Sequence, residues 1–284
     1  MQVKTVLITG CSSGIGAALA REFHGRGHRV YATARQLSAL DPLAALGIRP
    51  LALDVNDDAA IGAALDAVRT ESGSIDLLVN NAGISKVGAV VDLTRDDLRG
   101  QFETNVIAPV RVTALALPLL RAAVAMQGRA VVANVGSIVG LFTTPFASAY
   151  CSSKAAVHSL TDALRMELAP FGIDVVCIQP GGVRSSFGEN AEAAMRLPQD
   201  SLYRSVEAGI RARAQAGQQG ATPADEFVVP VVGALLHDTP PRTVRGGTHS
   251  VRLPLLKRLL PAAAFDAKLA KAFGLDRLRG PRQN

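Results

Sequence analysis

The sequence predicts an α/β fold in which one doubly wound, parallel sheet of about seven strands carries helices on both faces. Three observations predict it. Short, β-branched apolar runs alternate with Ala- and Leu-rich stretches along the chain. Of the 284 residues, 48% are hydrophobic, which is enough for one large core. Polar or glycine-rich turns follow the apolar runs, as expected where parallel strands end at one edge of a sheet.

The first predicted unit is a strand, a glycine-rich loop and a helix. The strand covers residues 3–9, the loop is Gly10-Cys-Ser-Ser-Gly14-Ile-Gly16, and the helix runs to about Arg26. Such a unit binds a dinucleotide, because glycines permit a tight turn and the helix N-terminus offers free N–H groups to a pyrophosphate. Glycines also end strands in proteins without a cofactor, but the Gly-x-x-x-Gly-x-Gly spacing is more specific than a lone glycine loop.

The second predicted strand, residues 28–34, ends at Arg35. In dinucleotide-binding folds an acid at this point holds the ribose 2′-hydroxyl of NAD, whereas a basic group accepts a 2′-phosphate. Ala34 and Arg35 supply no acid and one guanidinium, so NADP(H) is favoured over NAD(H). The alternative is an ordinary surface arginine.

The remaining elements continue the alternation. Asp54, at the end of the third strand, would accept a hydrogen bond from an adenine amino group or cap the helix that begins near residue 56. Bends are expected at Pro109 and Pro118 in the helix that begins at Thr94. The predicted elements are strands 48–55, 74–80, 131–137 and 172–179, with an exit loop to Gly83 after the second of these, and helices from Thr94 to about Met126 and from Ala149 to Ala169.

Tyr150 and Lys154 lie four residues apart on the last of these helices, and therefore on one face. An ammonium near a phenol favours the phenolate and lowers the tyrosine pKa from about 10. The pair would then give and take a proton at a carbonyl or an alcohol. Taken alone, such a pair is more often two side chains that merely share a helix face.

Together these motifs resemble the short-chain dehydrogenase/reductase family, in order and spacing over roughly residues 3–250. The resemblance implies a Rossmann-like fold and hydride transfer with a nicotinamide cofactor. It implies that Tyr150 is the general acid/base, that Ser137 binds the substrate oxygen, that Lys154 lowers the tyrosine pKa and holds the nicotinamide ribose, and that Asn105 supports a water-linked proton path to Lys154. It implies cofactor contacts from Gly10, Ser12, Ser13, Gly14, Ile15, Gly16, Arg35, Asp54, Val55, Asn81, Ala82, Gly83, Tyr150, Lys154, Pro180, Gly181, Val183 and Ser185.

A narrower likeness links Val30-Tyr-Ala-Thr-Ala-Arg35 and the stretch from Leu253 to Asp276 to the hydroxysteroid and retinol dehydrogenase branch of that family. It implies an NADP(H)-dependent oxidoreductase acting on CH–OH groups of bulky, apolar substrates, such as steroid-, retinoid- or lipid-like alcohols and carbonyls. The family often has Thr soon after Val183, where this chain offers Ser185 and Ser186. The family also implies a homodimer or homotetramer.

Residues 184–221 are expected to form a substrate lid over the carboxyl edge, within a cofactor-binding domain of residues 1–250. Helical stretches are expected at 191–195 and 202–214, with a loose segment at 215–220. The substrate is expected to contact Ser137, Tyr150 and Phe187. Further candidates for the apolar lining, with ordinary packing as the alternative, are Met195, Leu197, Leu202 and Tyr203.

Residues 251–284 are expected to form a basic helical extension. From Arg242 onward the chain carries ten Lys/Arg and two Asp/Glu, a net +8, whereas the first 241 residues carry 20 and 22, a net −2. The extension would shield the pocket, pack against a subunit or make peripheral contact with a membrane surface. No stacking aromatics or reading motif accompany the charge, so nucleic acid is not an expected partner.

Three further observations bear on function. Cys11, Cys151 and Cys177 are odd in number and at no metal-binding spacing, which favours a reduced, cytoplasmic protein without a metal. No secretory signal is expected at the start of the chain.

A catalytically silent NADP(H)-binding sensor or scaffold is the alternative function. A hydrolase lacks support, since His158 is the only histidine near the Ser137 and Tyr150 segments.

Overall fold

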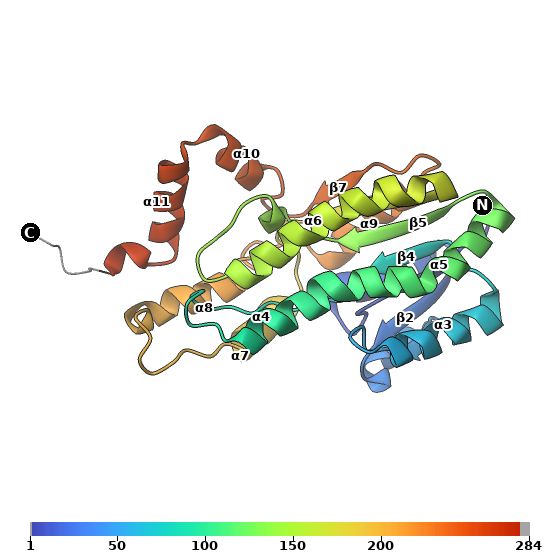
Figure 1. Ribbon diagram of the computed structural model, residues 1–284, viewed down its shortest axis with the longest axis horizontal. Helices are drawn as coiled ribbons and strands as arrows, with labels where there is room; N and C mark the ends of the chain where they lie inside the picture. Colours follow the sequence, from blue (N-terminus) through green and yellow to red (C-terminus); the bar gives the residue numbers. More distant parts are fainter. Residues whose placement is uncertain (1, 279–284) are drawn as a thin grey trace, which may run out of the picture.

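A computed structural model describes residues 2–278 and contains one seven-stranded sheet (Figure 1). The strand order is β3-β2-β1-β4-β5-β6-β7, and every pair is parallel. This confirms the predicted fold class. The chain reverses direction across the sheet between β1 and β4, which creates a crevice at the carboxyl edge. The strands are β1 (Thr5–Ile8), β2 (Arg29–Ala34), β3 (Arg49–Ala52), β4 (Leu77–Asn80), β5 (Ala130–Val135), β6 (Ile173–Pro180) and β7 (Thr243–Gly246).

Alternate residues of the strands point into two separate apolar layers. In β1, Val6 and Ile8 pack with α1 (Gly14–Gly25) and α9 (Ala224–Leu236). Leu7 packs on the other face with α3 (Asp58–Ser72), α5 (Ala108–Gln127) and the end of α6 (Ser148–Leu168). Burial on both faces explains why the strands are apolar runs rather than alternating patterns.

The two edge strands carry the weakest apolar signal. β3 contains Pro50, which lacks a backbone N–H and is tolerated because β3 lies at the edge of the sheet. β7 has the sequence Thr-Val-Arg-Gly and is exposed or half-buried throughout. The sequence predicts about seven strands, but its apolar runs mark the positions of only six, because β7 lacks such a run.

The long helix that the sequence predicts contains a π-helical turn. α4 (Arg95–Phe102) passes into a π-helical segment, Glu103–Ile107, and then into α5. Pro109 has no N–H to donate, and Ala108 N donates to the Glu103 carbonyl instead. The irregularity therefore precedes Pro109, whereas Pro118 lies within regular α5.

The same continuous helix, residues 95–127, is long and apolar enough to cross a membrane by length and composition. In this fold it covers the sheet. Val112, Ala116 and Leu120 are buried in the apolar layer shared with α3. Its apolar character is accounted for by this packing.

Four helices lie beyond the carboxyl ends of the strands, on the side toward which the arrows of Figure 1 point. α8 starts five residues later than the sequence predicts, after a 3₁₀ turn at Arg204–Val206. The last six residues of the predicted extension lie outside the described residues. These helices are α7 (Phe187–Ala193), α8 (Glu207–Gln215), α10 (Arg252–Leu259) and α11 (Ala262–Ala272); the short α2 (Asp41–Ala44) lies elsewhere, beside β3.

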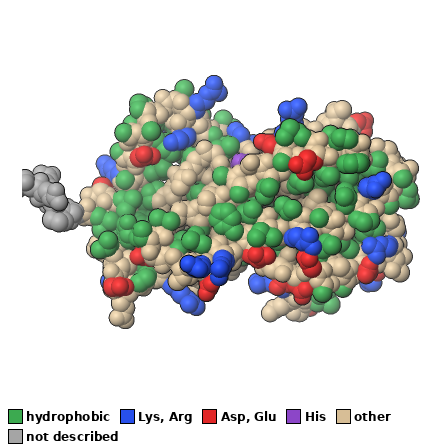
Figure 2. Space-filling view, viewed as in Figure 1, with side chains coloured by type: hydrophobic (Ala, Val, Ile, Leu, Met, Phe, Trp, Pro, Cys, Tyr) green, Lys and Arg blue, Asp and Glu red, His purple; other side chains and the backbone are tan. Residues whose placement is uncertain are grey.

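The extension packs on the rest of the chain while leaving some of its surface apolar. Leu256 and Leu260 pack around Phe265, which is buried, whereas Leu255 and Leu259 are exposed. In Figure 2, basic and apolar side chains alternate over this end of the molecule, at the upper left. The extension therefore packs on its own chain, and its packing against a second subunit stays a prediction.

Gly16→Ala is predicted to destabilise the fold by about 2 kcal/mol or more, since the added Cβ would overlap the Gly10 carbonyl oxygen and lie 2.5 Å from Asn81 Nδ2. Gly62→Ala is the matched control. It is also a helical glycine, but nothing lies within 4 Å of its Cβ position, so alanine should stabilise the helix by up to about 1 kcal/mol. Urea unfolding of both variants checks this, and equal effects of the two substitutions would contradict it.

Candidate active site

One cavity of about 820 Å³ opens at the carboxyl edge of the sheet. Residues after all seven strands contribute to its wall, with further residues from α7, α8, α10 and α11. Of the residues predicted to bind cofactor or substrate, every one lines this cavity. Of the predicted catalytic residues, only Asn105 does not.

The glycine loop presents an uncapped helix N-terminus to the cavity. Ser13 is the N-cap residue of α1, but its side chain makes no capping hydrogen bond and no acidic residue stands in the first turn. By contrast, Asp57 caps α3 and Thr94 caps α4. The first N–H groups of α1 therefore lack side-chain partners, and their positive dipole end suits a pyrophosphate.

A reciprocal set of hydrogen bonds fixes this loop against the exit of β4. Thr9 Oγ1 accepts from the backbone N–H groups of Asn81 at 2.9 Å and Ala82 at 3.0 Å. Asn81 Nδ2 donates to the carbonyl oxygens of Thr9 and Gly10, both at 2.8 Å. Gly10 has a φ of +71°, and a Cβ there would lie 2.7 Å from Ala82 Cα. Only glycine fits that approach without strain.

At the far end of the cavity, Arg35 and Asp54 occupy the positions that the sequence predicts. Arg35 is exposed, and no carboxylate among residues 2–278 forms an ion pair with it. Asp54 accepts from Asn56 N at 3.0 Å, and the cap of α3 is Asp57. The alternative of Asp54 as that helix cap is therefore wrong. Both side chains are available to a ligand in the cavity.

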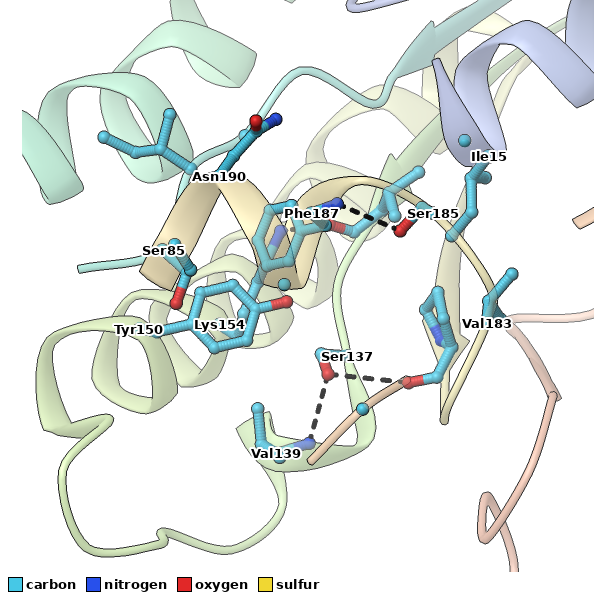
Figure 3. Close-up of a pocket in the computed structure, with 18 of the residues that line it drawn as sticks. Ile15, Ser85, Ser137, Val139, Tyr150, Lys154, Val183, Ser185, Phe187 and Asn190 are labelled. Carbon is cyan, nitrogen blue, oxygen red and sulfur yellow. Dashed lines mark hydrogen bonds between the residues drawn. The ribbon is translucent and has the colours of Figure 1, made fainter. Parts of the chain in front are cut away.

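Ser137 is held at the end of β5 by three contacts. Its hydroxyl donates to the Pro180 carbonyl at 3.5 Å and accepts from Val139 N at 3.3 Å (Figure 3). Its backbone N–H donates to His158 Nε2 at 3.4 Å. The sequence suggested His158 only as a weak candidate for a hydrolase and did not predict that it binds the Ser137 backbone. Its position one turn after Lys154 on the same helix was the one sequence feature that pointed to the site.

His158 is packed tightly between two glycines. A Cβ at either Gly136 or Gly140 would lie 2.5 Å from the imidazole ring. Burial, together with the nearby Lys154 ammonium, lowers the pKa of His158 to about 4. The ring is therefore neutral at pH 7 and accepts from Ser137.

Tyr150 and Lys154 face the same cavity, but their pKa values differ from the expectation. Burial raises the pKa of Tyr150 to about 12, against smaller opposing effects of Ser137 and Arg213. Lys154 is itself buried, which lowers its pKa to about 8, and its Nζ donates to the Val135 carbonyl at 2.7 Å. The net shift of the tyrosine pKa is therefore upward rather than downward as expected, because the loss of hydration outweighs the effect of nearby charges. A protonated phenol at neutral pH follows.

Asn105 lies behind the cavity wall. Its Oδ1 accepts from Ile84 N at 2.9 Å, and its Nδ2 donates to the Ile84 carbonyl at 3.0 Å and to Ser153 Oγ at 3.1 Å. In this arrangement Asn105 fixes the loop after β4 against α6 and makes no hydrogen bond to Lys154 Nζ. The expected proton path through Asn105 stays a prediction.

The substrate end of the cavity is formed by α7, α8 and the C-terminal helices. Phe187 packs against Tyr150, with ring centroids 5.5 Å apart (Figure 3). The other four lid candidates do not line the cavity: Met195, Leu197 and Tyr203 pack in a separate cluster, and Leu202 is 81% exposed. Lining residues that the sequence analysis missed are Phe142, Thr144, Arg213, Leu253, Leu269 and Phe273.

The segment at 215–220, predicted to be loose, is anchored to the cavity wall. Gln218 Oε1 accepts from Ser185 N at 3.0 Å, and its Nε2 donates to the Val183 carbonyl at 3.4 Å. Leu253 and Leu269 of the extension also line the cavity. Shielding of the pocket, one of the three expected roles of the extension, is thus present.

No group of three or more His, Cys, Asp or Glu side chains that could hold a metal ion occurs within residues 2–278. The three cysteines are buried and unbonded. The Tyr150 phenol, the Ser137 hydroxyl and the Lys154 ammonium all line the cavity.

Comparisons with known proteins agree with this geometry. A family model described as short chain dehydrogenase matches residues 4–196. A short-chain dehydrogenase/reductase of Pestalotiopsis microspora is 36% identical over 280 residues, 96% of this chain and 95% of that protein. An NADPH-dependent 1-acyldihydroxyacetone phosphate reductase of Schizosaccharomyces pombe is 38% identical over 208 residues, 70% of this chain and 68% of that protein.

Two crystal structures have the same fold. A short-chain dehydrogenase from Streptomyces avermitilis superposes with a TM-score of 0.77 at 30% identity, covering 98% of both chains. A 3-ketoacyl-(acyl-carrier-protein) reductase from Brucella melitensis, complexed with NADH, superposes with a TM-score of 0.69 at 25% identity, covering 83% of this chain and 91% of the other.

His158→Gln is predicted to reduce the acid sensitivity of the protein. Because the folded-state pKa of His158 lies below its ordinary value of 6.5, the wild type loses stability as pH falls from about 6.5 to about 4. Glutamine has no such titration, so the variant should lose about 2 kcal/mol less between pH 7 and pH 4.5. Burial also lowers the pKa of His28, so the acid-induced loss of stability that is due to His28 remains in the wild type and in the variant.

Urea unfolding at the two pH values measures this difference. The control, His237→Gln at an exposed site, should follow the wild type. An equal loss in wild type and His158→Gln would show that His158 is not neutral in the folded protein.

Proposed function

The chain belongs to the short-chain dehydrogenase/reductase family of oxidoreductases, and from this membership we propose that it transfers a hydride between NADP(H) and a carbonyl or alcohol group of a bulky, apolar substrate. The observation that carries the proposal is a shared cavity. The glycine loop with its uncapped helix, the Tyr150 phenol and the Ser137 hydroxyl all open into it.

The residues of the chain supply the proton and the electrostatics. When bound, the nicotinamide supplies or accepts the hydride. In reduction, the Ser137 hydroxyl donates a hydrogen bond to the carbonyl oxygen, and Tyr150 delivers its proton as negative charge grows there. Burial keeps the phenol protonated at neutral pH, which suits this direction. In oxidation the phenolate accepts the proton from the alcohol.

Lys154 holds positive charge below the reacting groups. Its Nζ lies 5.8 Å from the centre of the Tyr150 ring and is bonded to the Val135 carbonyl. With a pKa of about 8 it is charged at pH 7. The ammonium lowers the cost of a developing phenolate, and by family resemblance it holds the nicotinamide ribose.

Preference for NADP(H) rests on Arg35 and on the lack of an acid at the end of β2. A guanidinium accepts a phosphate by paired hydrogen bonds, and Arg35 has no carboxylate partner among residues 2–278. One relative is NADPH-dependent, and one structure of the family holds NADH, so family membership alone does not choose.

An apolar substrate is supported by the outer wall of the cavity. Phe142, Leu253 and Leu269 belong to one apolar cluster of this wall, and Phe187 and Phe273 also line the cavity. Closely packed apolar walls favour a ligand with a large hydrocarbon body. The lid and the C-terminal helices together supply this wall.

Tyr150→Phe is predicted to lower kcat for ketone reduction by at least about 10³-fold, because the proton donor is lost. The Kd for NADPH should change less than threefold, since the ring remains. Tyr203→Phe is the matched control, because Tyr203 packs outside the cavity, and it should retain wild-type turnover. Near-normal turnover by Tyr150→Phe would overturn the mechanism. A wild type that binds NADPH but reduces no ketone or aldehyde would favour the sensor alternative.

Arg35→Ala is predicted to weaken NADPH at least tenfold more than NADH, because only NADPH carries the 2′-phosphate. Fluorescence titration of both cofactors measures the two Kd values. Arg69→Ala, on the exposed face of α3, is the control and should change neither. An equal loss for both cofactors in Arg35→Ala would remove the assigned role.

A further inference from the structure

Arg213 brings a positive charge to the substrate end of the cavity, whose wall combines apolar side chains such as Phe142 and Phe187 with polar ones such as Thr144. It lies on α8, whose neighbouring residues Ile210 and Ala214 are buried in the cluster under the lid. Its side chain lines the cavity together with Tyr150 and Phe142. The packing of Ile210 and Ala214 fixes the direction in which residue 213 projects.

The Arg213 guanidinium is only partly satisfied. Its Nε donates to Thr144 Oγ1 at 2.6 Å, and neither terminal nitrogen has a hydrogen-bond partner within the described part of the chain. No carboxylate there pairs with it. Arg211, two residues earlier, forms ion pairs with Glu207 at 2.7 Å and Glu192 at 3.6 Å. Carboxylates are thus available on α7 and α8, but Arg213 points away from them into the cavity.

Arg213 also lies close to the reacting groups. Its positive charge acts on the Tyr150 phenol, in the direction opposite to the dominant effect of burial. Because the side chain is half-buried and lines the cavity, its unused donors are accessible to a ligand there. Apolar side chains of the same wall, such as Phe142 and Phe187, lower the local polarity and strengthen the attraction for an anion.

We propose that Arg213 binds an anionic group, a carboxylate or a phosphate, that the substrate carries beside its apolar body. Its two terminal nitrogens form the fork that matches either group, while the bond from Nε to Thr144 fixes the plane of the fork. The proposal rests on the proposed function and narrows it. The substrate is then an amphiphilic oxo or hydroxy acid, or a phosphate ester, rather than an uncharged steroid- or retinoid-like molecule.

Two other roles fit part of the geometry. In the first, Arg213 only links α8 to the segment that carries Thr144 through its hydrogen bond. In the second, its positive charge only lowers the pKa of Tyr150. Neither role distinguishes charged from uncharged ligands. Ligand charge is therefore the variable that the experiment must change.

Binding is tested first, without any need for turnover. With NADPH present, decanoate and decyl phosphate should raise the Tm of the wild type, and 1-decanol should raise it less. The rise due to the anions should vanish in Arg213→Met and survive in part in Arg213→Lys. Arg211→Met, with its cation removed from the same helix, should behave as the wild type. A wild-type shift that is equal for decanoate, decyl phosphate and decanol would overturn the proposal, as would anion-induced shifts that survive in Arg213→Met.

Turnover provides the second measurement. Straight-chain oxodecanoic acids with the ketone at carbon 4, 5 or 6 are compared with their methyl esters, and 1-hydroxy-2-decanone phosphate with its free alcohol. For one of the two anions, the wild type should have a kcat/KM at least tenfold higher than for its neutral partner. Whether that anion is the carboxylate or the phosphate identifies the group that Arg213 binds. Arg213→Met should lower kcat/KM for the preferred anion at least ten times more than for its neutral partner.

The outcomes separate the two proposals. Equal losses for the anion and its neutral partner in Arg213→Met would assign Arg213 to positioning or to Tyr150 and overturn anion binding. Neutral ketones reduced as well as their anionic partners by the wild type would do the same while leaving the proposed function intact. Absence of turnover on every compound, with the anion-specific Tm shifts present, would instead contradict the proposed function and support the anion site.

Discussion

The pair of hydrogen bonds between Thr9 and Asn81 is the constraint on which the site depends. It ties the end of β1 to the exit of β4 at the place where the chain order of the sheet reverses. Because Asn81 also binds the Gly10 carbonyl, the glycine loop is held at a fixed distance from the cavity floor. As a result, Gly16 also lies close to the Gly10 carbonyl oxygen and to Asn81 Nδ2. Without this contact, the uncapped start of α1 would have no fixed relation to the chemistry on the next strands.

A second chain of polar contacts carries that order across the sheet to the catalytic helix. Asn80 Nδ2 donates to Asn134 Oδ1 at 2.9 Å, and Asn134 Nδ2 donates to Thr161 Oγ1 at 3.0 Å. β4, β5 and α6 are therefore linked by buried side-chain hydrogen bonds as well as by apolar packing. Lys154 adds a bond from α6 to the end of β5, and His158 holds Ser137 from the same helix. The distance between the phenol and the serine hydroxyl is thus set by one rigid helix lying on two paired strands.

Much of the fold and of the cofactor side of the cavity followed from the sequence, because both are encoded locally. Apolar runs mark buried strands, and in a parallel sheet the end of each run falls at the same edge, so Arg35, Asp54, Asn80 and Ser137 are predicted to lie along one edge. β7 was not located, because an edge strand needs no apolar run. The pKa of Tyr150 was expected in the wrong direction, because i,i+4 spacing gives proximity but not the degree of hydration. The bond of His158 to Ser137 and the place of Arg213 depend on packing between distant segments, which no local pattern reports.

The two ends of the cavity differ in how they are built, and this difference explains where specificity resides. The cofactor end is formed largely by backbone N–H groups and glycines at strand ends, which the sheet itself positions. The substrate end is formed by side chains from a lid and a C-terminal extension that meet where Phe273 passes against Gly209 of α8. A Cβ at Gly209 would overlap the Phe273 carbonyl oxygen, so the extension fixes the helix that carries Arg213. Changes in the last third of the chain can therefore alter the substrate end of the cavity while leaving the glycine loop, Ser137 and Tyr150 in place.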